Sequence, residues 1–595
     1  MNASDENPIP PTIVAAVARL RQSGIARDVS EARERKNTAS HQGWYSVTCT
    51  VCPRVPADGH FPSRVLLDVF IHPAFPFGAI EVFPPESICH YPHQGPDGRK
   101  LCLKPDWRAP VDESRLTVYV AWAREWLEDA AKDVLLAPGD AYELPPFIEL
   151  EVGREVLFQE DNESFQWWRS NPERHGLFTF ADYSGHKRSY VTGFSTRQGG
   201  LTLKWGSLVR PENPRVGIWL RCSRELVVER RRAPATWAEL TSILDREGIS
   251  LRETLLAYRT SVSYEAKRVL LLLGFPIPTT VGGENTEIHW QPVLLPDWSE
   301  AKGFRPGKHR ALVEYAFTNG VMSPSKQVPW AGSTNVSPNR LFARGGLPKE
   351  FQETSVSLVG CGSLGSAIAS LITRGGLRKI ALFDGDNISA GNLSRHECDI
   401  SDLGEPKARR LGFRLCLISP HLEFTACSSS LPFLSDRAPE CEELTSTDLW
   451  IDCSSCERIH LYLDKLARSR GKVVVHTYVT FGAKYICACS GGEKRTSEEI
   501  HNLVLEGRGT NTIPDDFFEQ PKAEDLLLEG AGCWHPTFPA AWYSIVLLAS
   551  GLVGYLSRLF PQDWRTPWAF VMQNPWPHGE AETITKPVIW SQRFP

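Results

Sequence analysis

A glycine-rich turn between a strand-like segment and an apolar helix places the strongest constraint on the fold of this chain. The pattern predicts a strand over 355–359, a helix over 364–373 and a second strand over 379–383. Two strands joined by a helix in this way lie parallel in one sheet. Further strands are predicted over 448–451, 472–477 and 483–489. We therefore expect an α/β domain in the last part of the chain.

The turn itself indicates a nucleotide site. Gly360, Gly362 and Gly365 fit the pattern G-x-G-x-x-G. Glycine lets the backbone approach a phosphate, and the N-terminus of the following helix favours its negative charge. Asp384 closes the second strand, where a carboxylate can accept hydrogen bonds from ribose hydroxyls. A nicotinamide- or flavin-dependent dehydrogenase has the same features, so these residues do not choose between nucleotides.

Charged residues farther along the chain favour ATP. Asn392 and Arg395 follow Asp386, and Lys407 stands near the start of a helix predicted over 405–417. Arg and Lys supply cationic donors suited to a triphosphate. A dinucleotide oxidoreductase does not need this set, although each residue alone reads as a surface salt bridge.

A carboxylate follows one of the later strands. Asp452 ends the predicted strand in Trp450-Ile451-Asp452-Cys453. At that place a carboxylate can hold Mg²⁺ near phosphates. Together with the cationic residues, Asp452 predicts a site for ATP and Mg²⁺.

These residues resemble the adenylation domain of ThiF/MoeB-type enzymes in the ubiquitin-activating superfamily. The resemblance rests on Gly360, Gly362, Gly365, Asp384, Asp386, Asn392, Arg395, Lys407 and Asp452. It covers roughly the last two-fifths of the chain and implies a Rossmann-like domain over 336–595 that works as a homodimer. In that family an arginine before the first strand reaches into the partner's ATP site. Arg344 matches that position better than Arg340.

The first quarter of the chain predicts a separate α+β module. Ile13, Val14, Val17 and Leu20 share one face of a predicted helix. Three strands are expected over 44–51, 64–71 and 79–83, then a cysteine-containing loop and a helix over 114–135.

This module resembles a ubiquitin-conjugating enzyme. The resemblance rests on the segments 73–77, 80–85, 98–102 and 107–110. It implies that Cys102 receives an acyl group as a thioester. The His-Pro-Asn of the family, whose asparagine assists attack on the thioester, reads His-Tyr-Pro-His-Gln over 90–94. His93 or Gln94 takes that place, and His93 is the candidate because a side-chain donor can face the developing oxyanion. The missing asparagine leaves transfer to lysine open.

A second candidate nucleophile, Cys533, stands in a glycine-rich turn before an apolar helix. Exposure and a nearby helix terminus lower the pKa of a thiol and raise its thiolate fraction. His535 is close in sequence and can assist. The weaker candidates are Cys453, Cys456, Cys487 and Cys489. We predict no structural zinc, because neither Cys49-x-x-Cys52 nor Cys453-x-x-Cys456 has a well-spaced second pair.

Composition excludes several classes of protein. The net charge of -5 gives no reason to expect nucleic-acid binding. The polar, acidic N-terminus does not predict a signal peptide, so we expect a cytoplasmic protein with reduced cysteines. The uncharged segment 540–556 is expected to be a buried or interface helix rather than a membrane span. The Trp-rich region 147–335 shows no motif that carries chemistry, and we expect a mixed linker or docking domain there.

Together the two modules are similar to the bacterial fusion of conjugating and activating enzymes found in CBASS antiphage operons, with domains over 1–146, 147–335 and 336–595. That resemblance implies that the C-terminus of a cGAS-like nucleotidyltransferase is adenylated, passed to Cys533 and then Cys102, and joined to a protein or small amine. The donor could instead be a small bacterial ubiquitin-like protein. Alternatives from other classes are an NAD-dependent oxidoreductase, a sulfur-carrier activating enzyme and a non-catalytic binding protein.

Overall fold

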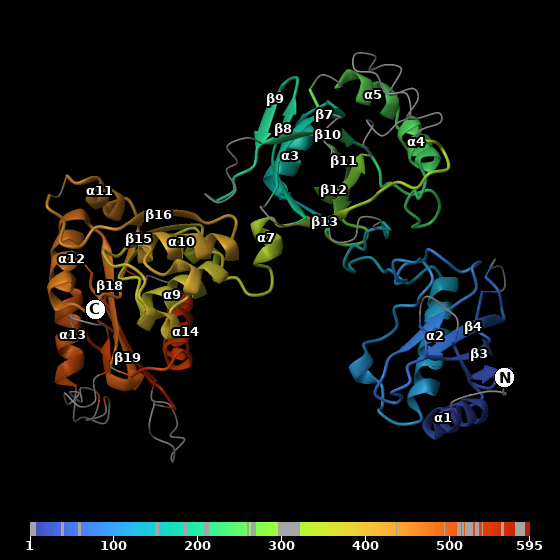
Figure 1. Cartoon of the computed structure of the whole chain (residues 1–595), viewed down its shortest axis with the longest axis horizontal. Helices are drawn as coiled ribbons and strands as arrows, with labels where there is room; N and C mark the ends of the chain where they lie inside the picture. Colours follow the sequence, from blue (N-terminus) through green and yellow to red (C-terminus); the bar gives the residue numbers. More distant parts are fainter. Residues whose placement is uncertain are drawn as a thin grey trace, which may run out of the picture. The chain divides into compact units, whose positions relative to one another are not determined.

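The protein is described here by a computed structural model. The described residues are 8–36, 41–56, 61–148, 154–182, 187–206, 214–258, 261–262, 269–295, 322–435, 437–492, 494–507, 513, 517, 527–529, 535–537, 539–560, 565–576 and 589–594. The chain divides into two compact units. One contains Met1–Thr202 and Pro214–Asn335, and the other contains Leu203–Asn213 and Val336–Pro595 (Figure 1).

The N-terminal region is an α+β module, as predicted. Its elements are α1 (Pro11–Gln22), β1 (Ala26–Arg27), β2 (Arg33–Glu34), β3 (Tyr45–Val51), β4 (Val65–Ile71), β5 (Ile80–Phe83), η1 (Asp106–Arg108) and α2 (Arg115–Ala131). The antiparallel sheet has the order β1-β3-β4-β5, with β2 paired to β3. Buried and less buried residues alternate along β3 and β4, and the buried face packs with α1 and α2 in one core.

Two details of this region differ from the prediction. Val14 is 49% exposed, and Ala16 takes its place on the buried face of α1. Helix α2 ends at Ala131 rather than at residue 135. Asp133 has a φ of 56°, in the left-handed region, which cannot continue a right-handed helix.

The middle region is built on one mixed sheet of eight strands. Its elements are β6 (Glu155–Phe158), α3 (Asn162–Ser170), β7 (His175–Asp182), β8 (Arg188–Thr196), β9 (Gly199–Thr202), β10 (Arg215–Arg221), α4 (Trp237–Arg246), α5 (Leu251–Ala257), β11 (Val269–Pro278), β12 (Asn285–Leu295) and β13 (Gly332–Asn335). The strand order is β12-β11-β10-β7-β8-β6-β13, with β9 paired to β8. Parallel and antiparallel pairs both occur in this sheet.

Several of the tryptophans of this region surround a buried carboxyl group. Trp168 and Trp290 each donate an indole N–H to Glu160 Oε1 at 2.8 Å, and Ser164 Oγ donates to Oε2 at 2.7 Å. Burial raises the pKa of Glu160 to about 8. The three donors satisfy a group that would otherwise be costly to bury, so the tryptophans serve the core of this domain.

The C-terminal region is an α/β domain, as predicted, and its main sheet has eight strands among the described residues, three more than the sequence predicted. Its elements are α7 (Pro338–Leu341), α8 (Lys349–Gln352), β14 (Ser355–Val359), α9 (Ser363–Arg374), β15 (Lys379–Phe383), η4 (Ala390–Arg395), η5 (Ile400–Asp402), α10 (Lys407–Ile418), β16 (Glu423–Cys427), α11 (Pro439–Thr445), β17 (Leu449–Asp452), α12 (Glu457–Arg470), β18 (Val473–Val479), η6 (Phe481–Ala483), β19 (Tyr485–Ser490), α13 (Ser497–Glu506), β20 (Leu527–Glu529), β21 (His535–Thr537), α14 (Trp542–Leu559), β22 (Trp568–Gln573) and β23 (Ile589–Arg593).

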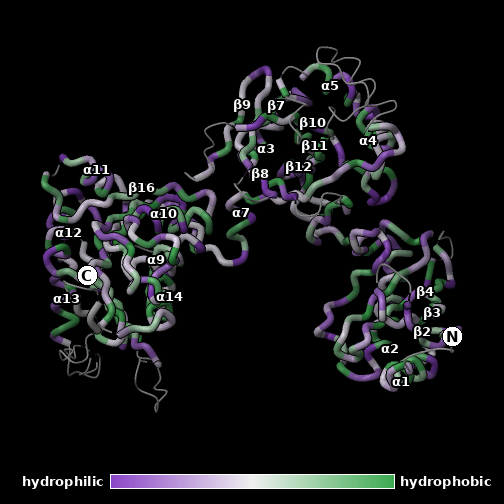
Figure 2. Tube along the Cα trace, in the orientation of Figure 1, coloured by the Kyte–Doolittle hydropathy of each residue, from purple (hydrophilic) through white to green (hydrophobic). Residues whose placement is uncertain are grey.

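The strand order of this sheet is β16-β15-β14-β17-β18-β19-β22-β23. The pairs from β16 to β18 are parallel, and those from β18 to β23 are antiparallel. Figure 1 shows α9, α10 and α14 on one side of the sheet and α12 and α13 on the other. In Figure 2, hydrophobic and hydrophilic residues follow one another along these elements, as expected for layers with one buried face.

Two helices of this domain bear on the sequence expectations. Helix α10 begins at Lys407 rather than at residue 405, because Gly404 has a φ of 82° and Pro406 is extended. By length and composition alone, α14 is the one helix among the described residues that could cross a membrane. Its Ile545, Leu548 and Leu552 are buried in the core beside the sheet, where α14 packs on α9.

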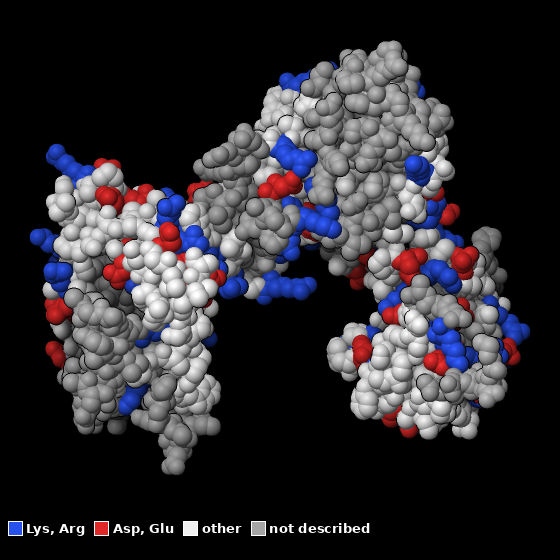
Figure 3. Space-filling view, in the orientation of Figure 1, with Lys and Arg blue, Asp and Glu red and all other residues white. Residues whose placement is uncertain are grey.

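Acidic and basic side chains are interspersed on the face shown in Figure 3, with no segregation into a single basic surface there. This distribution agrees with the small net charge of -5. A continuous basic surface is the usual electrostatic signature of nucleic-acid binding.

Candidate functional site

The glycine turn joins β14 to α9, and two of its glycines are required by close backbone packing. A Cβ on Gly360 would lie 2.8 Å from Cys453 C and Ser454 N, and Gly360 has a φ of 86°. A Cβ on Gly365 would overlap the carbonyl oxygen of Gly360. The third glycine differs, because no atom of the described residues lies within 4 Å of a Cβ built on Gly362. Gly362 is the N-cap of α9, so this open space lies where a helix terminus favours an anion.

Asp384 follows β15 and is tied to the turn. Its Oδ2 accepts the N–H of Cys361 at 2.7 Å, and its Oδ1 accepts the N–H of Asp386 at 2.8 Å. Burial raises the pKa of the Asp384 carboxyl, while the two N–H donors and Lys407 oppose that effect. The carboxyl group is thereby fixed in orientation beside the glycine turn.

Lys407 is paired with the carboxylate of Asp386. The Nζ of Lys407 lies 2.9 Å from Asp386 Oδ2, and its backbone N–H donates to Asp386 O at 2.9 Å. The Lys407 side chain is only 11% exposed, whereas that of Asp386 is 75% exposed. An incoming phosphate can therefore replace an exposed carboxylate without leaving the buried ammonium uncompensated.

The residues between Asp386 and Lys407 form a short helical segment, η4. The Oδ1 of Asn392 accepts the N–H of Ser389 at 2.9 Å and the hydroxyl of Ser389 at 3.0 Å, which caps η4. Arg395, the last residue of η4, is half-buried. Asn392 therefore has a local structural role in addition to any contact with a ligand.

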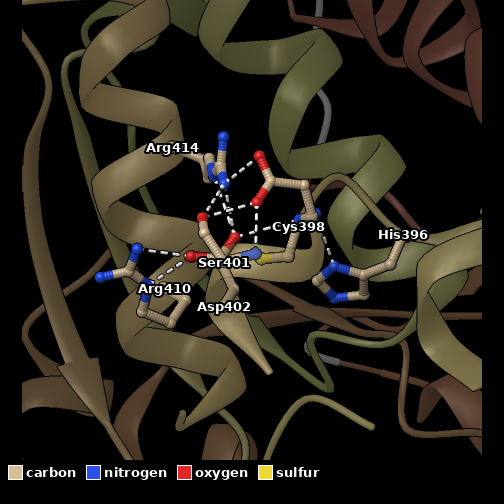
Figure 4. Close-up of polar contacts among 7 residues, drawn as sticks. His396, Cys398, Ser401, Asp402, Arg410 and Arg414 are labelled. Carbon is tan, nitrogen blue, oxygen red and sulfur yellow. Dashed lines mark hydrogen bonds and ion pairs between the residues drawn. The ribbon is translucent and has the colours of Figure 1, made fainter. Parts of the chain in front are cut away.

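A polar network holds the segment after Arg395. Asp402 is fully buried and accepts hydrogen bonds from the guanidinium groups of Arg410 and Arg414 on α10 (Figure 4). His396 Nδ1 accepts the N–H of Cys398 at 3.0 Å, so its Nε2, 2.7 Å from Cys361 O, is the donor to the glycine turn. No sequence motif predicted this network, which joins α10 and the segment after η4 to the turn.

Asp452 ends β17 and is fully buried. Its Oδ1 accepts the N–H of Ser454 at 2.9 Å, and its Oδ2 lies 2.9 Å from His476 Nδ1. The ring of His476 stacks on that of His460 at 3.7 Å. In the parallel sheet Asp452 is the register partner of Val359, the residue before the glycine turn. Sequence reasoning missed His476, because its place opposite Asp452 is set by the register of β17 and β18.

The structure thus brings Gly360, Gly362, Asp384, Lys407 and Asp452 to the carboxyl ends of adjacent parallel strands. That edge is where open α/β sheets bind ligands. Among the described residues, Arg344 is a sequence candidate that is not joined to this edge. Arg344 is exposed in the segment after α7, and Cys533 lies outside the described residues.

Cys102 is exposed on a loop of the N-terminal module. Its N–H donates to His93 O at 2.8 Å, and the N–H of Leu101 donates to Val82 O at 2.9 Å. Burial raises the pKa of the Cys102 thiol, the negative charge of Glu143 raises it further, and Lys100 lowers it. At rest Cys102 is therefore mostly a thiol.

His93 and Gln94 have different environments. Gln94 is buried, with its amide donating to Ile88 O at 2.9 Å and its Oε1 accepting the N–H of Tyr91 at 2.8 Å. Those contacts hold the loop in shape. His93 is exposed and has a φ of 56°, so of the two it is the side chain that a substrate can reach.

Comparison with known proteins assigns the domains. Residues 133–336 match the Cap2 central linker domain, and residues 337–492 match the ThiF family. The chain therefore carries a Cap2 central linker domain and a ThiF domain. The ThiF match favours adenylation over nicotinamide chemistry.

The chain is also similar to two relatives of known name and to one solved structure. The chain is 26% identical over 584 residues to the ATP-dependent ubiquitin transferase-like protein Cap2 of Enterobacter hormaechei, covering 92% of this chain and 95% of that protein. It is 25% identical over 150 residues to the molybdopterin-synthase adenylyltransferase of Escherichia coli, covering 23% of this chain and 59% of that protein. A crystal structure of E. coli MccB matches at 13% identity with a TM-score of 0.27, over 41% of this chain and 65% of that chain. The chain is an enzyme of the ubiquitin transferase-like, adenylating class.

Proposed function

We propose that this enzyme uses ATP to activate the C-terminal carboxylate of a protein and joins it to an amine through two thioesters. The observation that carries the proposal is that one chain contains both the nucleotide turn with Asp384, Lys407 and Asp452 and an exposed thiol, Cys102, on a conjugating-enzyme-like module. Its similarity to Cap2 extends over both parts.

The ThiF domain would bind the nucleotide as follows. The N-terminus of α9 faces the phosphates across Gly362, and the carboxylate of Asp384 accepts hydrogen bonds from the ribose hydroxyls. Lys407 exchanges the carboxylate of Asp386 for a phosphate oxygen, and Arg395 provides a second cation. The carboxylate of the donor protein then attacks the α-phosphate, which gives an acyl adenylate and pyrophosphate.

The residues at the sheet edge fit a magnesium ion. Each oxygen of Asp452 accepts one hydrogen bond and keeps a second lone-pair position, and Mg²⁺ prefers carboxylate oxygens together with phosphates. We assign Asp452 as the residue that would hold Mg²⁺, whose charge offsets that of the triphosphate. His476 and Ser454 fix the carboxylate in place.

The thioester relay follows. Cys533 attacks the adenylate carbonyl and releases AMP, and Cys102 then takes the acyl group by exchange of one thioester for another. An amine attacks the Cys102 thioester, which gives an amide and returns the thiol. Each step forms one bond and breaks one bond at the same carbonyl carbon, which divides one difficult reaction into easier ones.

We propose a cGAS-like nucleotidyltransferase as the donor, in antiphage defence, because the similarity to Cap2 covers 92% of this chain. A small bacterial ubiquitin-like protein is the second candidate donor. We also propose that the ThiF domain acts as a homodimer, in which the exposed Arg344 reaches the ATP site of the partner subunit.

Pyrophosphate exchange tests the adenylation step. With Mg²⁺, ATP and the donor, the full chain should incorporate labelled pyrophosphate into ATP, and a donor that lacks its last residue should not support exchange. If neither candidate donor supports exchange, the proposal is wrong. Replacing ATP by NAD in a binding titration separates the enzyme from a dehydrogenase.

A further inference from the structure

The segment that follows α2 is bound to the middle region by backbone hydrogen bonds. Gly139 donates to Val281 O at 2.9 Å, and the N–H of Val281 donates to Asp140 O at 2.8 Å. The N–H of Tyr142 donates to Thr279 O at 3.1 Å. Residues 139–142 therefore lie along the turn between β11 and β12. We call residues 137–146 the strap.

The strap carries Glu143 to His93, beside the reactive thiol. The N–H of His93 donates to Glu143 Oε2 at 3.1 Å, and the Nδ1 of His93 lies 3.4 Å from the same oxygen. Because the N–H of Cys102 donates to His93 O, the three residues are neighbours. The effect of the Glu143 charge on the pKa of Cys102 agrees with this arrangement.

The middle region also holds the loop that precedes Cys102. The guanidinium of Arg231 donates to Glu143 O, and its backbone N–H donates to His90 O at 3.3 Å. Arg230 donates to Cys89 O at 3.4 Å and lies 4.4 Å above the ring of Tyr91. One turn of the middle region thus fixes both the strap and the residues before His93.

A carboxylate on Nδ1 determines what the other nitrogen of His93 can do. In neutral histidine one ring nitrogen carries the proton and the other accepts. Glu143 favours the proton on Nδ1, so Nε2 is left as the acceptor that can take a proton from an attacking amine. The pairing suits His93 for accepting a proton from an amine more than for donating to an oxyanion.

The chemistry of Cys102 creates a need for such a base. A thiol with a raised pKa is a poorer leaving group, so its thioester reacts more slowly with an amine. The amine must also lose a proton in the course of attack. A base beside the sulfur can take up the proton that the amine loses.

We propose that Glu143 is a positioning residue for amine transfer from Cys102, and that the middle region serves to hold it on His93. The amine nitrogen bonds to the thioester carbonyl carbon, the carbon–sulfur bond breaks, and the electron pair leaves with Cys102 as thiolate. The proton from the amine passes to Nε2 of His93 and then to the thiolate. The inference rests on the role proposed above for Cys102.

The test separates acyl transfer from adenylation. The full chain with Cys533→Ala is loaded at Cys102 by exchange with a synthetic peptide thioester, and the Cys102 adduct is followed by mass spectrometry. Discharge is started with free L-lysine across a pH series. We expect Glu143→Gln to load at least as fast as the parent, to discharge to lysine about 10–100-fold more slowly, and to lose the pH dependence that His93 gives to the parent.

Hydroxylamine is unprotonated at neutral pH, and its adduct is acidic enough to lose a proton to water, so it should discharge the variant at least as fast as the parent. His93→Ala should slow lysine discharge as much as Glu143→Gln, and the double variant no further, because the two residues act as one unit. Glu86→Gln changes an exposed carboxylate of the same module and is the matched control.

Equal discharge to lysine by Glu143→Gln and the parent would overturn the inference and leave pyrophosphate exchange untouched. An equal slowing with lysine and hydroxylamine would also overturn it, because a distorted loop impairs both reactions. The other charges that act on Cys102 are those of Lys100 and Asp97, and both residues are unchanged in Glu143→Gln and in His93→Ala.

Discussion

The two candidate sites differ in how much of their surroundings the fold fixes. At the nucleotide turn, Asp384 and Asp452 are held by backbone N–H groups and by His476, and Gly360 and Gly365 leave no room for a side chain. At the other site Cys102 and His93 are exposed. A site that stabilises charge on a small ligand benefits from groups already in position. A site that must accept one protein and release its acyl group to another needs open access.

The largest effects should come from the two cysteines. Cys102→Ala should abolish conjugation while the acyl group remains on Cys533 and pyrophosphate exchange is unchanged. Cys533→Ala should remove both thioesters and leave exchange intact. Mass spectrometry of the two cysteine peptides measures both results. Loss of exchange in a folded Cys533→Ala variant would show that Cys533 is misassigned.

The next largest effect is expected at the buried carboxylate. Asp452→Asn keeps the shape of the side chain and the bond from Ser454 but removes the charge, so exchange should fall by about 1000-fold or more. Asp448 precedes the same strand, and its carboxylate accepts hydrogen bonds from Ser355. The variant Asp448→Asn is the control and should retain exchange. Retained exchange in Asp452→Asn would remove Asp452 from the proposed metal role.

The glycines provide a matched pair for the nucleotide turn. Gly365→Ala would overlap Gly360 O and should destabilise the domain by about 2–4 kcal/mol, as overpacking of a close backbone contact does. Gly362→Ala enters open space and should change the free energy of unfolding by less than about 0.5 kcal/mol, yet weaken ATP binding about tenfold. Urea unfolding measures the free energy of unfolding, and an ATP titration measures the affinity for ATP. Equal destabilisation by both variants would mean that the space at Gly362 is not kept for a ligand.

The smallest effects concern the thiol at the open site. Burial and Glu143 raise the pKa of Cys102. Its thiolate fraction should therefore continue to increase above the pH at which an ordinary thiol is half ionised. The rate of iodoacetamide alkylation should increase with the thiolate fraction. Glu143→Gln removes a negative charge that raises the pKa of Cys102, so the variant should be alkylated faster than the parent at neutral pH. Lys100→Ala should slow it. Slower alkylation in Glu143→Gln would contradict the electrostatic account of this site.

The same comparison shows what the sequence could predict. The glycine turn, Asp384, Lys407 and Asp452 were found because strand–turn–helix order places the ends of parallel strands together. His476 and the Asp402 network were missed, because their partners are set by strand register and helix packing rather than by spacing along the chain. Glu143 was missed for a stronger reason. Its position on His93 depends on the β11–β12 turn and on Arg231, residues far away in sequence.

The helix boundaries also show which features follow from the sequence pattern and which depend on tertiary packing. The predicted end of α2 was four residues too late, since the left-handed Asp133 has no strong sequence signal. Val14 fitted the apolar pattern of α1 but lies at the edge of the buried face. Periodicity identified the elements, and tertiary packing decided which residues of each are covered.

The most direct test of the account follows the acyl group from one site to the other. The full chain is incubated with Mg²⁺, ATP and a cGAS-like nucleotidyltransferase, quenched in acid, and its cysteine peptides are analysed by mass spectrometry. The account predicts the C-terminal residues of the donor on Cys102 in the parent, and on neither cysteine in Cys533→Ala. A donor adduct that reaches Cys102 without Cys533, or AMP formation with no adduct on either cysteine, would contradict it.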